Sequence, residues 1–265
     1  MRVTVLGTRG SMAVSNEKMR EFGGATSSYM VEEDGEVLFF DAGSGIMNIP
    51  EGTESGKQIW LLITHTHLDH IMGMPFFLSD FCGGKRLNIY GRSREGETVE
   101  RQLRHLFSRP LWPVGLRDYS GIKIVCHELE GEIKAGPFRI TWMESQHPGG
   151  AVNYRVDAGG KSIVLATDFE HSKGSEERLV AFSRDADLLL YDGQYTEKEY
   201  PTFRGFGHST PETGLQVFRK SGAKRMRIVH HAPDATDEEL NRRERLLKAQ
   251  EPNTGFARQG EILEL

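Results

Sequence analysis

Short apolar runs alternate with turn residues along most of the chain. They form a first block at residues 2–7, 27–33, 36–43, 59–63 and 86–91, and a second at 122–128, 136–144, 151–158, 161–168, 186–192 and 224–231. Runs of this length, rich in β-branched and aromatic residues, are typical of β-strands. Asp34-Gly35 and Ala158-Gly159-Gly160 predict tight turns between neighbouring strands. The pattern therefore predicts two β-rich blocks.

Helical patterns accompany both blocks. Apolar residues recur at helical spacing from Asp69 to Phe77, and further helices are predicted at residues 96–108, 175–183, 210–222 and 236–250. The segment 108–121 is rich in Pro and Gly and predicts a loop. No low-complexity linker separates the blocks, so we expect a single domain over residues 1–265. Two mixed sheets packed face to face, with helices outside, would bury the apolar side of every element, which places the fold in the α/β (α+β) class.

Composition limits the kinds of protein that this chain can be. The 265 residues are 37% hydrophobic and 27% charged, with a net charge of -5, which disfavours binding of duplex nucleic acid. The two cysteines, Cys82 and Cys126, argue against a disulfide scaffold and favour a reducing compartment. The first eleven residues predict a strand and a Gly-rich turn rather than a signal peptide, and no apolar run is long enough to span a membrane. We therefore expect a cytoplasmic globular protein.

The hexapeptide His65-Thr66-His67-Leu68-Asp69-His70 contains three of the ten histidines of the chain. Alternate residues of an extended segment point the same way, so His65 and His67 can converge on one ion, while Asp69 and His70 are presented to a neighbouring position. Imidazole and carboxylate groups are common ligands of Zn²⁺ and similar metals. A helix cap at Asp69 is the simpler alternative, but the density of histidines favours a metal site.

The hexapeptide matches the HxHxDH signature of the metallo-β-lactamase superfamily, and the resemblance extends over nearly the whole chain. It implies a four-layer αββα sandwich with one or two metal ions at one edge of the paired sheets. Three later segments resemble further elements of the family: ESQHPGG with His147, SIVLATD with Asp168, and RMRIVHH with His230 and His231. Upstream, LFFDAG resembles a strand of the family that ends in Asp41, a residue that in the family supports the metal loop.

Carried over residue by residue, the resemblance implies two divalent metal ions. The first would be held by His65, His67 and His147, the second by Asp69, His70 and His230, with Asp168 bridging both. His231 remains the alternative last ligand, because adjacent residues of a strand point opposite ways; the ribonuclease Z-like pattern favours His230. Zn²⁺ is the expected metal, although Mn²⁺ and Fe accept the same ligands. The remaining histidines outside the motifs match no family element and are expected on the surface or in packing: His105, His127 and His171.

Two metal ions with a bridging hydroxide suit the hydrolysis of phosphodiesters, lactones and amides alike. His67 stands where oxygen-reducing diiron relatives carry Glu, which favours a hydrolase. Gly207-His208-Ser209-Thr210 resembles the GHST segment of ribonuclease Z and related phosphodiesterases, where it opens a helix whose N–H groups can bind an anion. We predict that His208, with Arg204 nearby, holds a phosphate oxygen or protonates the leaving alkoxide. The predicted catalytic groups are Asp69, Asp168 and His208.

Ribonuclease Z carries a long arm for transfer RNA between its lone His motif and its bridging Asp, whereas only a tight pair of strands separates His147 from Asp168 here. We therefore predict a phosphodiesterase acting on a small, cyclic nucleotide-like phosphodiester rather than a tRNA 3′-end endonuclease. A lid at residues 81–88 or 108–121 would place Trp112 and Tyr119 either against a ring of the substrate or against the core. The alternatives are a lactone or (thio)ester hydrolase and a non-catalytic metal-binding module. The sequence does not determine the oligomeric state, and a homodimer is among the alternatives.

Overall fold

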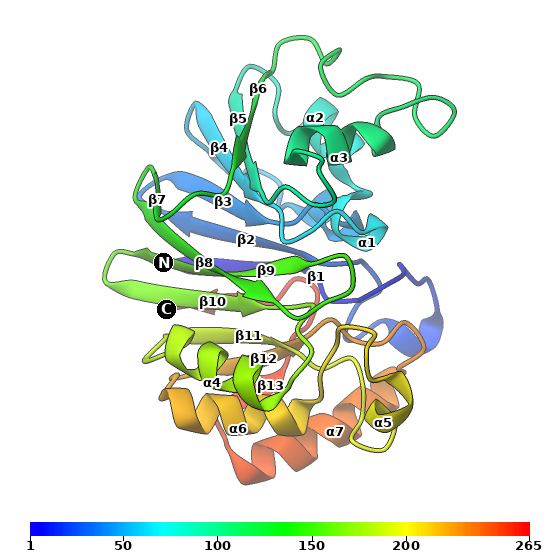
Figure 1. Ribbon diagram of the computed structural model, residues 1–265, viewed down its shortest axis with the longest axis vertical. Helices are drawn as coiled ribbons and strands as arrows, with labels where there is room; N and C mark the ends of the chain where they lie inside the picture. The colour runs from blue at the N-terminus through cyan, green and yellow to red at the C-terminus, as the bar shows by residue number, and fades with distance from the viewer.

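Two seven-stranded sheets packed face to face form the centre of the protein in the computed structural model, which describes all 265 residues (Figure 1). In spatial order, the first sheet consists of β14 (Ile262–Glu264), β1 (Arg2–Gly7), β2 (Ser28–Glu33), β3 (Glu36–Phe40), β4 (Gln58–Leu62), β5 (Arg86–Gly91) and β6 (Lys123–Glu128). The second consists of β13 (Thr254–Phe256), β12 (Met226–Val229), β11 (Leu188–Asp192), β10 (Lys161–Ala166), β9 (Ala151–Ala158), β8 (Phe138–Ser145) and β7 (Ile133–Ala135). Both sheets are mixed, with parallel pairing from β3 to β6 and from β10 to β13.

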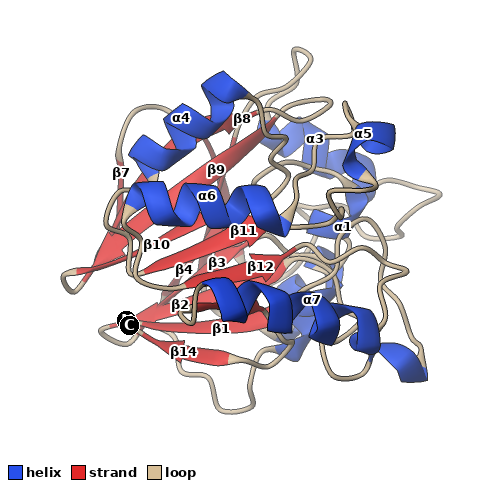
Figure 2. Cartoon of the chain, turned by 90° about the horizontal axis from the view of Figure 1, so that it is seen from below, coloured by secondary structure: helices blue, strands red, loops and turns tan.

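Helices cover both outer faces of this pair of sheets. The first sheet is covered by α1 (Leu68–Ile71), α2 (Met74–Asp80) and α3 (Val99–Leu106). The second is covered by α4 (Lys173–Phe182), α6 (Pro211–Ser221) and α7 (Asp237–Gln250), which Figure 2 shows lying across it. The short elements η1 (Glu17–Met19), η2 (Ser44–Asn48) and α5 (Tyr200–Phe203) lie in connections. The predicted four-layer αββα arrangement is therefore confirmed.

The strand pattern explains why three apolar layers form. In β3, Leu38 and Phe40 belong to the core between the two sheets, whereas Val37 and Phe39 pack under the helices of the first sheet. Successive side chains of a strand point to opposite faces, so a continuous apolar run fits a strand that is buried on both sides. Each large side chain that is fully buried contributes roughly 1.5–3 kcal/mol of transfer free energy.

Some elements differ from the sequence prediction. The pattern did not predict β7, β13 and β14, because three residues are too few to show a period of two. The helix predicted from Asp69 is divided at Gly73 into α1 and α2. A Cβ at Gly73 would lie 2.3 Å from the carbonyl oxygen of Gly43, so the chain approaches η2 too closely there for a side chain.

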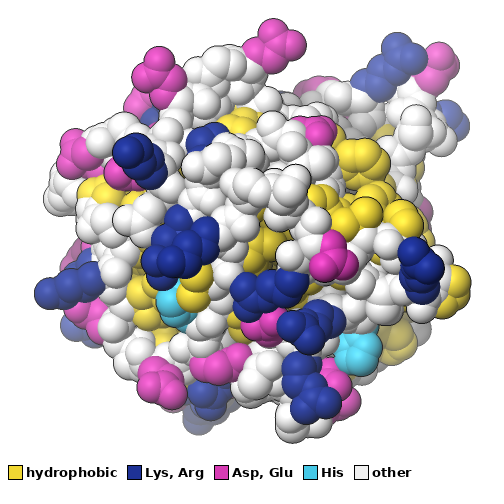
Figure 3. Space-filling view, turned by 90° about the horizontal axis from the view of Figure 1, so that it is seen from above, with side chains coloured by type: hydrophobic (Ala, Val, Ile, Leu, Met, Phe, Trp, Pro, Cys, Tyr) yellow, Lys and Arg dark blue, Asp and Glu magenta, His cyan; other side chains and the backbone are white.

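The outer surface carries mixed charge. Figure 3 shows Lys and Arg side chains interspersed with Asp and Glu on the face seen from above, with apolar side chains exposed between them. This face shows no broad area of one sign. None of the helices combines the length and the apolar character needed to cross a membrane.

Candidate metal centre

The candidate ligands all follow the carboxyl ends of strands, at one edge of the paired sheets. His65 and His67 lie between β4 and α1, and Asp69 and His70 belong to α1. The other three come from the second sheet, where His147 follows β8, Asp168 follows β10 and His230 follows β12. Both sheets therefore contribute to one site.

These seven side chains form interlocking groups. The ligand atoms of each of three sets lie within 4.8 Å of one another: His65, His67 and His147; Asp69, His70 and His230; and His65, His70 and Asp168. Asp168 stands between the first two sets, with Oδ2 3.2 Å from His70 Nε2 and Oδ1 3.8 Å from His147 Nε2. Asp168 therefore lies next to donors of both sets.

The imidazoles present free nitrogens to the centre of the cluster. The Nδ1–H of His70 donates to Asp41 at 2.7 Å, that of His147 to the carbonyl of Gly207 at 3.1 Å, and that of His230 to Gln194 Oε1 at 2.8 Å. Each bond leaves Nε2 as the nitrogen available to a metal. The Nε2 atoms of His65, His70 and His230 are buried and have no hydrogen-bond partner. Buried polar atoms without partners are costly, so this convergence fits a divalent metal ion, and the nitrogen and oxygen donors suit Zn²⁺, Mn²⁺ or Fe.

The buried charges of the cluster depend on one another. Burial favours a neutral His70, but Asp168, Asp69 and Asp41 outweigh it and raise the pKa of His70 well above its usual value. Burial alone would raise the pKa of Asp168, yet the surrounding histidines, His230 first, lower it well below the ordinary range. Burial and the neighbouring His70 lower the pKa of His65. Metal ions would displace the imidazole protons, so metal binding by such a site releases protons.

Three of the strand ends have left-handed backbone at residues other than glycine. The φ angles are 54° at Asp41, 53° at Asp168 and 59° at His230. Such angles are uncommon for residues other than Gly, Asn and Asp, and residues held in them cluster at functional sites. Each marks the point where the chain leaves a buried strand and turns at the edge that carries the cluster.

Asp192, at the end of β11, supports the cluster and was missed by the sequence prediction. Its Oδ2 accepts hydrogen bonds from the backbone N–H of Asp168 at 2.9 Å and from His208 Nδ1 at 3.0 Å. Its Oδ1 accepts from the backbone N–H of Ser209 at 3.1 Å. A signal was present in the sequence, because the apolar run before Asp192 resembles the runs that end in Asp41 and Asp168.

The Gly-rich turn after β1 also reaches the cluster. The backbone N–H of Ser11 donates to Asp69 Oδ2 at 2.7 Å. A Cβ at Gly10 would lie 2.1 Å from His230 Nδ1 and 2.6 Å from Gln194 Oε1. This turn therefore holds Asp69 and needs a glycine where it passes His230.

Glu170 holds the loop before His208. Its carboxylate is buried and accepts hydrogen bonds from the backbone N–H groups of Gly205, at 2.8 Å, and Gly207, at 2.9 Å. The carbonyl of Gly207 then accepts the bond from His147 described above. A Cβ at Gly207, which has a φ of 91°, would lie 1.9 Å from His147 Nδ1. The loop is thus built around His147, a link that the sequence prediction did not include.

The structure places His230 in the cluster and His231 outside it. His231 is buried between Phe22 and Phe256, and its Nε2–H donates to the carbonyl of Ala257 at 2.9 Å. Burial lowers the pKa of His231 to about 3 and so keeps the ring neutral. A packing role explains His231.

His208 borders the cluster with 7% of its surface exposed, and its ring lies 4.7 Å from that of His230. Because Asp192 holds Nδ1, Nε2 is the nitrogen left for another partner. At the start of α6, Thr210 is buried and its side chain accepts from the N–H of Thr213, so an anion site there stays a prediction. Arg204 lies over the ring of Tyr200 and has no place in the cluster.

In the loop at residues 108–121, Trp112 and Tyr119 are anchored by packing against neighbouring side chains rather than presented to a ligand. Trp112 donates to the hydroxyl of Tyr119 at 3.0 Å and packs edge-on against Phe76, while Tyr119 packs against Phe107. Leu111 is the residue of this loop that lines the pocket beside the cluster. No residue of the segment 81–88 lines that pocket.

The three unassigned histidines have separate surroundings. His127 stacks on Tyr90. His171 stacks on Tyr200, and its Nδ1 lies 2.7 Å from Ser209 Oγ. His105 lines the pocket beside the cluster.

Comparison with known proteins agrees with this geometry. The sequence model of the β-lactamase superfamily domain matches residues 57–231, which is more than half of the chain and includes the whole cluster. The chain belongs to the β-lactamase superfamily. It is 25% identical to ribonuclease Z of Haloarcula marismortui over 277 aligned residues, covering 87% of this chain and 86% of the relative.

Solved structures of this superfamily have the same fold. The metallo-β-lactamase fold protein YhfI from Bacillus subtilis superimposes with a TM-score of 0.74 at 20% identity, covering 100% of this chain and 98% of that one. A diphosphatase of the PhnP family superimposes with a TM-score of 0.72 at 24% identity, covering 100% of this chain and 97% of that one. These comparisons confirm the resemblance to the metallo-β-lactamase superfamily and identify this member as a metal-dependent hydrolase.

Proposed function

We propose that this protein is a dinuclear phosphodiesterase that hydrolyses a small phosphodiester. The observation that carries the proposal is the meeting of seven nitrogen and oxygen donor residues, five of them buried, in two sets with Asp168 between them and His208 at their border. One metal would be held by His65, His67 and His147, and the other by Asp69, His70 and His230. When bound, two such ions supply Lewis acidity for the phosphoryl oxygens and a nucleophile from water at neutral pH.

The residues around the metal ligands have separate tasks in this proposal. Asp41, Gly207 and Gln194 keep Nδ1 of three ligands protonated and so direct Nε2 inward. Asp192 orients His208 by holding Nδ1. The Nε2 atom of His208 would donate a proton to the leaving alkoxide, which requires it to lie within hydrogen-bond reach of that oxygen.

The connections of the second sheet support a small substrate over transfer RNA. β9 ends at Ala158 and β10 begins at Lys161, so only Gly159 and Gly160 join them. The transfer-RNA arm of ribonuclease Z would be inserted in this part of the chain. A compact diester, such as a cyclic nucleotide, needs no such arm.

Turnover of bis(p-nitrophenyl) phosphate after loading with Zn²⁺ or Mn²⁺ tests the proposal, with Asp168→Ala as the control. We expect turnover that requires metal and falls at least about 100-fold in Asp168→Ala. A protein that carries two ions per chain and leaves this diester intact would contradict the phosphodiesterase proposal. Lactones and thioesters would then be the substrates to examine.

His208→Ala tests whether His208 protonates the leaving group. p-Nitrophenolate leaves without a proton, whereas the sugar oxygen of a cyclic nucleotide leaves as an alkoxide. We expect His208→Ala to lower kcat on a cyclic nucleotide by about 10²- to 10⁴-fold and to affect bis(p-nitrophenyl) phosphate much less. Equal losses on both substrates would argue against proton donation by His208.

A further inference from the structure

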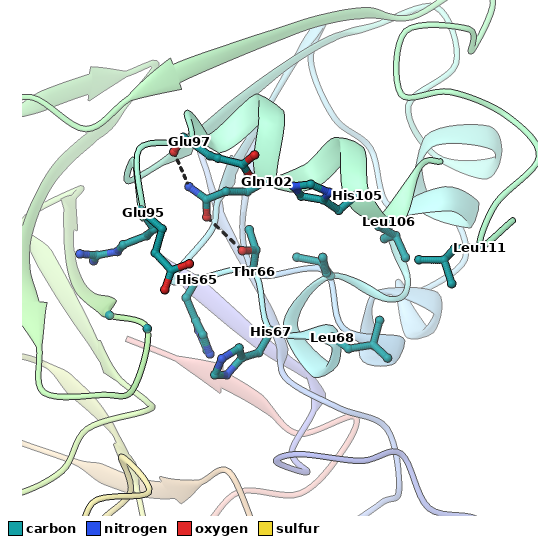
Figure 4. A pocket seen from close by; sticks show the side chains of 14 residues that line it. His65, Thr66, His67, Leu68, Glu95, Glu97, Gln102, His105, Leu106 and Leu111 are labelled. Atoms are coloured by element: carbon teal, nitrogen blue, oxygen red, sulfur yellow. Dashed lines mark hydrogen bonds and ion pairs between the residues drawn. The ribbon is translucent and has the colours of Figure 1, made fainter. Parts of the chain in front are cut away.

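A pocket of 660 Å³ opens directly beside the metal cluster (Figure 4). His65 and His67 form its inner end. The turn at residues 94–97, the helix α3 and Leu111 form its other walls. His65 is 6% exposed, and its Nε2 atom has no hydrogen-bond partner. A molecule bound to the cluster can therefore extend into this pocket.

The polar wall of the pocket is held in place by Gln102 of α3. Its Oε1 accepts from Thr66 Oγ1 at 3.0 Å, and its Nε2 donates to the carbonyl of Glu97 at 2.9 Å, as Figure 4 shows. The turn is closed by reciprocal backbone bonds between Arg94 and Glu97, of 3.0 and 2.8 Å. The turn and the metal loop are thus joined through one side chain, so the pocket is largely formed before a ligand arrives.

Besides the ligand histidines, four charged or titratable side chains face this pocket, and three of them have partners. Glu97 accepts from His105 Nε2 at 2.7 Å, and Arg94 pairs with Glu144 at 2.8 Å. Glu95 is exposed, makes no ion pair and no side-chain hydrogen bond, and directs its carboxylate toward the side formed by His65 and Thr66 (Figure 4). The unpaired charge that lines this pocket is therefore the carboxylate of Glu95.

The opposite wall is apolar and open to water. Leu68 is 56% exposed and Leu111 is 70% exposed, and Leu106 also lines the pocket. Covering exposed apolar side chains of this size favours binding, because it removes their apolar surface from water. A ligand with an apolar body would gain from this wall, while a ligand with a second anionic group would be repelled by Glu95.

We propose that this pocket binds one ester arm of the substrate, and that Glu95 selects an arm with an apolar body and a hydrogen-bond-donating or cationic group. Such a group is a sugar hydroxyl of a nucleoside or the ammonium head of a choline-like alcohol. The inference rests on the proposed phosphodiesterase activity, because the phosphate must lie at the cluster for its arm to enter the pocket. Glu95 is then a specificity-determining residue.

Three diesters with the same leaving group measure this selection. They are p-nitrophenyl phosphorylcholine, with a cationic arm; thymidine 5′-(p-nitrophenyl phosphate), with a neutral hydroxyl-bearing arm; and bis(p-nitrophenyl) phosphate, with neither. We expect Glu95→Ala to lower kcat/KM for one of the first two, relative to the third, by about tenfold or more. If the arm is cationic, Glu95→Gln should lower this kcat/KM ratio as much as Glu95→Ala does, because the amide carries no charge. If the arm carries a hydroxyl, Glu95→Gln should keep part of the ratio, because the amide oxygen still accepts a hydrogen bond. Glu177→Gln, an exposed change on α4, should leave the ratios as in the wild type.

Binding provides a readout that does not depend on turnover. Saturation-transfer NMR on chelator-treated protein should show binding of choline or thymidine to the wild type and not to Glu95→Ala. Unchanged kcat/KM ratios in both Glu95 variants would overturn the pocket assignment even if the enzyme hydrolyses all three diesters. If no diester is hydrolysed, the proposed function fails, and NMR alone decides: binding to the wild type that disappears in Glu95→Ala supports the pocket, and any other result overturns it.

Discussion

The carboxylate of Glu170 accepts a hydrogen bond of 2.9 Å from the backbone N–H of Gly207. The carbonyl of the same glycine accepts the Nδ1–H of His147. A buried carboxylate outside the ligand set therefore acts on a candidate metal ligand through one backbone residue. Outer partners of this kind fix the ring orientation and tautomer of a ligand histidine.

Glu170→Gln should weaken metal binding. The amide NH₂ would face a backbone N–H of Gly205 or Gly207 that now donates to a carboxylate oxygen. We expect the metal affinity to fall about 10- to 100-fold, measured by competition with a chelator. Glu177→Gln is the matched control. A loss of thermal stability without a change in affinity would show that Glu170 supports only the loop.

Gly10→Ala should disturb the same centre from the other sheet. The new Cβ would lie 2.1 Å from His230 Nδ1, so the turn or the imidazole must shift. We expect the affinity for the ion held by His230 to fall at least about tenfold, visible as lower metal content after dialysis. Gly83→Ala is the control, because nothing lies within 4 Å of a Cβ there. Equal metal content in both variants would contradict the role of this close approach.

His230→Ala should affect metal binding, whereas His231→Ala should affect stability. His230 presents an unpartnered Nε2 to the cluster, so its removal should lower the metal content and abolish turnover. His231 packs between Phe22 and Phe256, so its removal should cost about 2–4 kcal/mol of unfolding free energy, as other large-to-small core changes do, and leave the metal content unchanged. Metal analysis and urea unfolding of the two variants measure this. Metal loss in His231→Ala would reverse the assignment.

The pairing of Glu244 with Arg258 should make stability depend on acid pH. Burial opposes ionisation of Glu244, but hydrogen bonds from Arg258 and from the backbone N–H of Phe256 prevail and lower its pKa from 4.5 to about 2. A carboxyl whose pKa is depressed in the folded state stabilises the protein above its unfolded pKa. This contribution should be lost as the pH falls from about 4.5 to 2.

Glu244→Gln isolates that contribution from those of other carboxylates. We expect the variant to be less stable than the wild type by about 1–2 kcal/mol at pH 7. The difference should shrink toward pH 2, as measured by urea unfolding at several pH values. A difference that stays constant with pH would show that the ionised form of Glu244 has no special role.

The sequence by itself determined the elements and the centre of the candidate site. Apolar runs of strand length mark the long strands, because a strand buried between two layers needs apolar side chains on both faces. The hexapeptide around His67 is a local arrangement, so its chemistry is visible without a fold. His147 and Asp168 were placed by resemblance, and their strand ends reach the same edge of the structure.

Only the tertiary structure decided which other residues join the site. Ser11 lies 58 positions from Asp69, and Glu170 lies 37 positions from Gly207, yet each pair is in direct contact. The ribonuclease Z-like pattern favoured His230 over His231, and the structure adds a left-handed φ of 59° at His230, a conformation that no residue pattern around it indicates. Local periodicity records which side of a strand is buried. It does not record which distant strand ends and loops meet when two sheets pack. Such contacts form the pocket beside His67 and the support around His147.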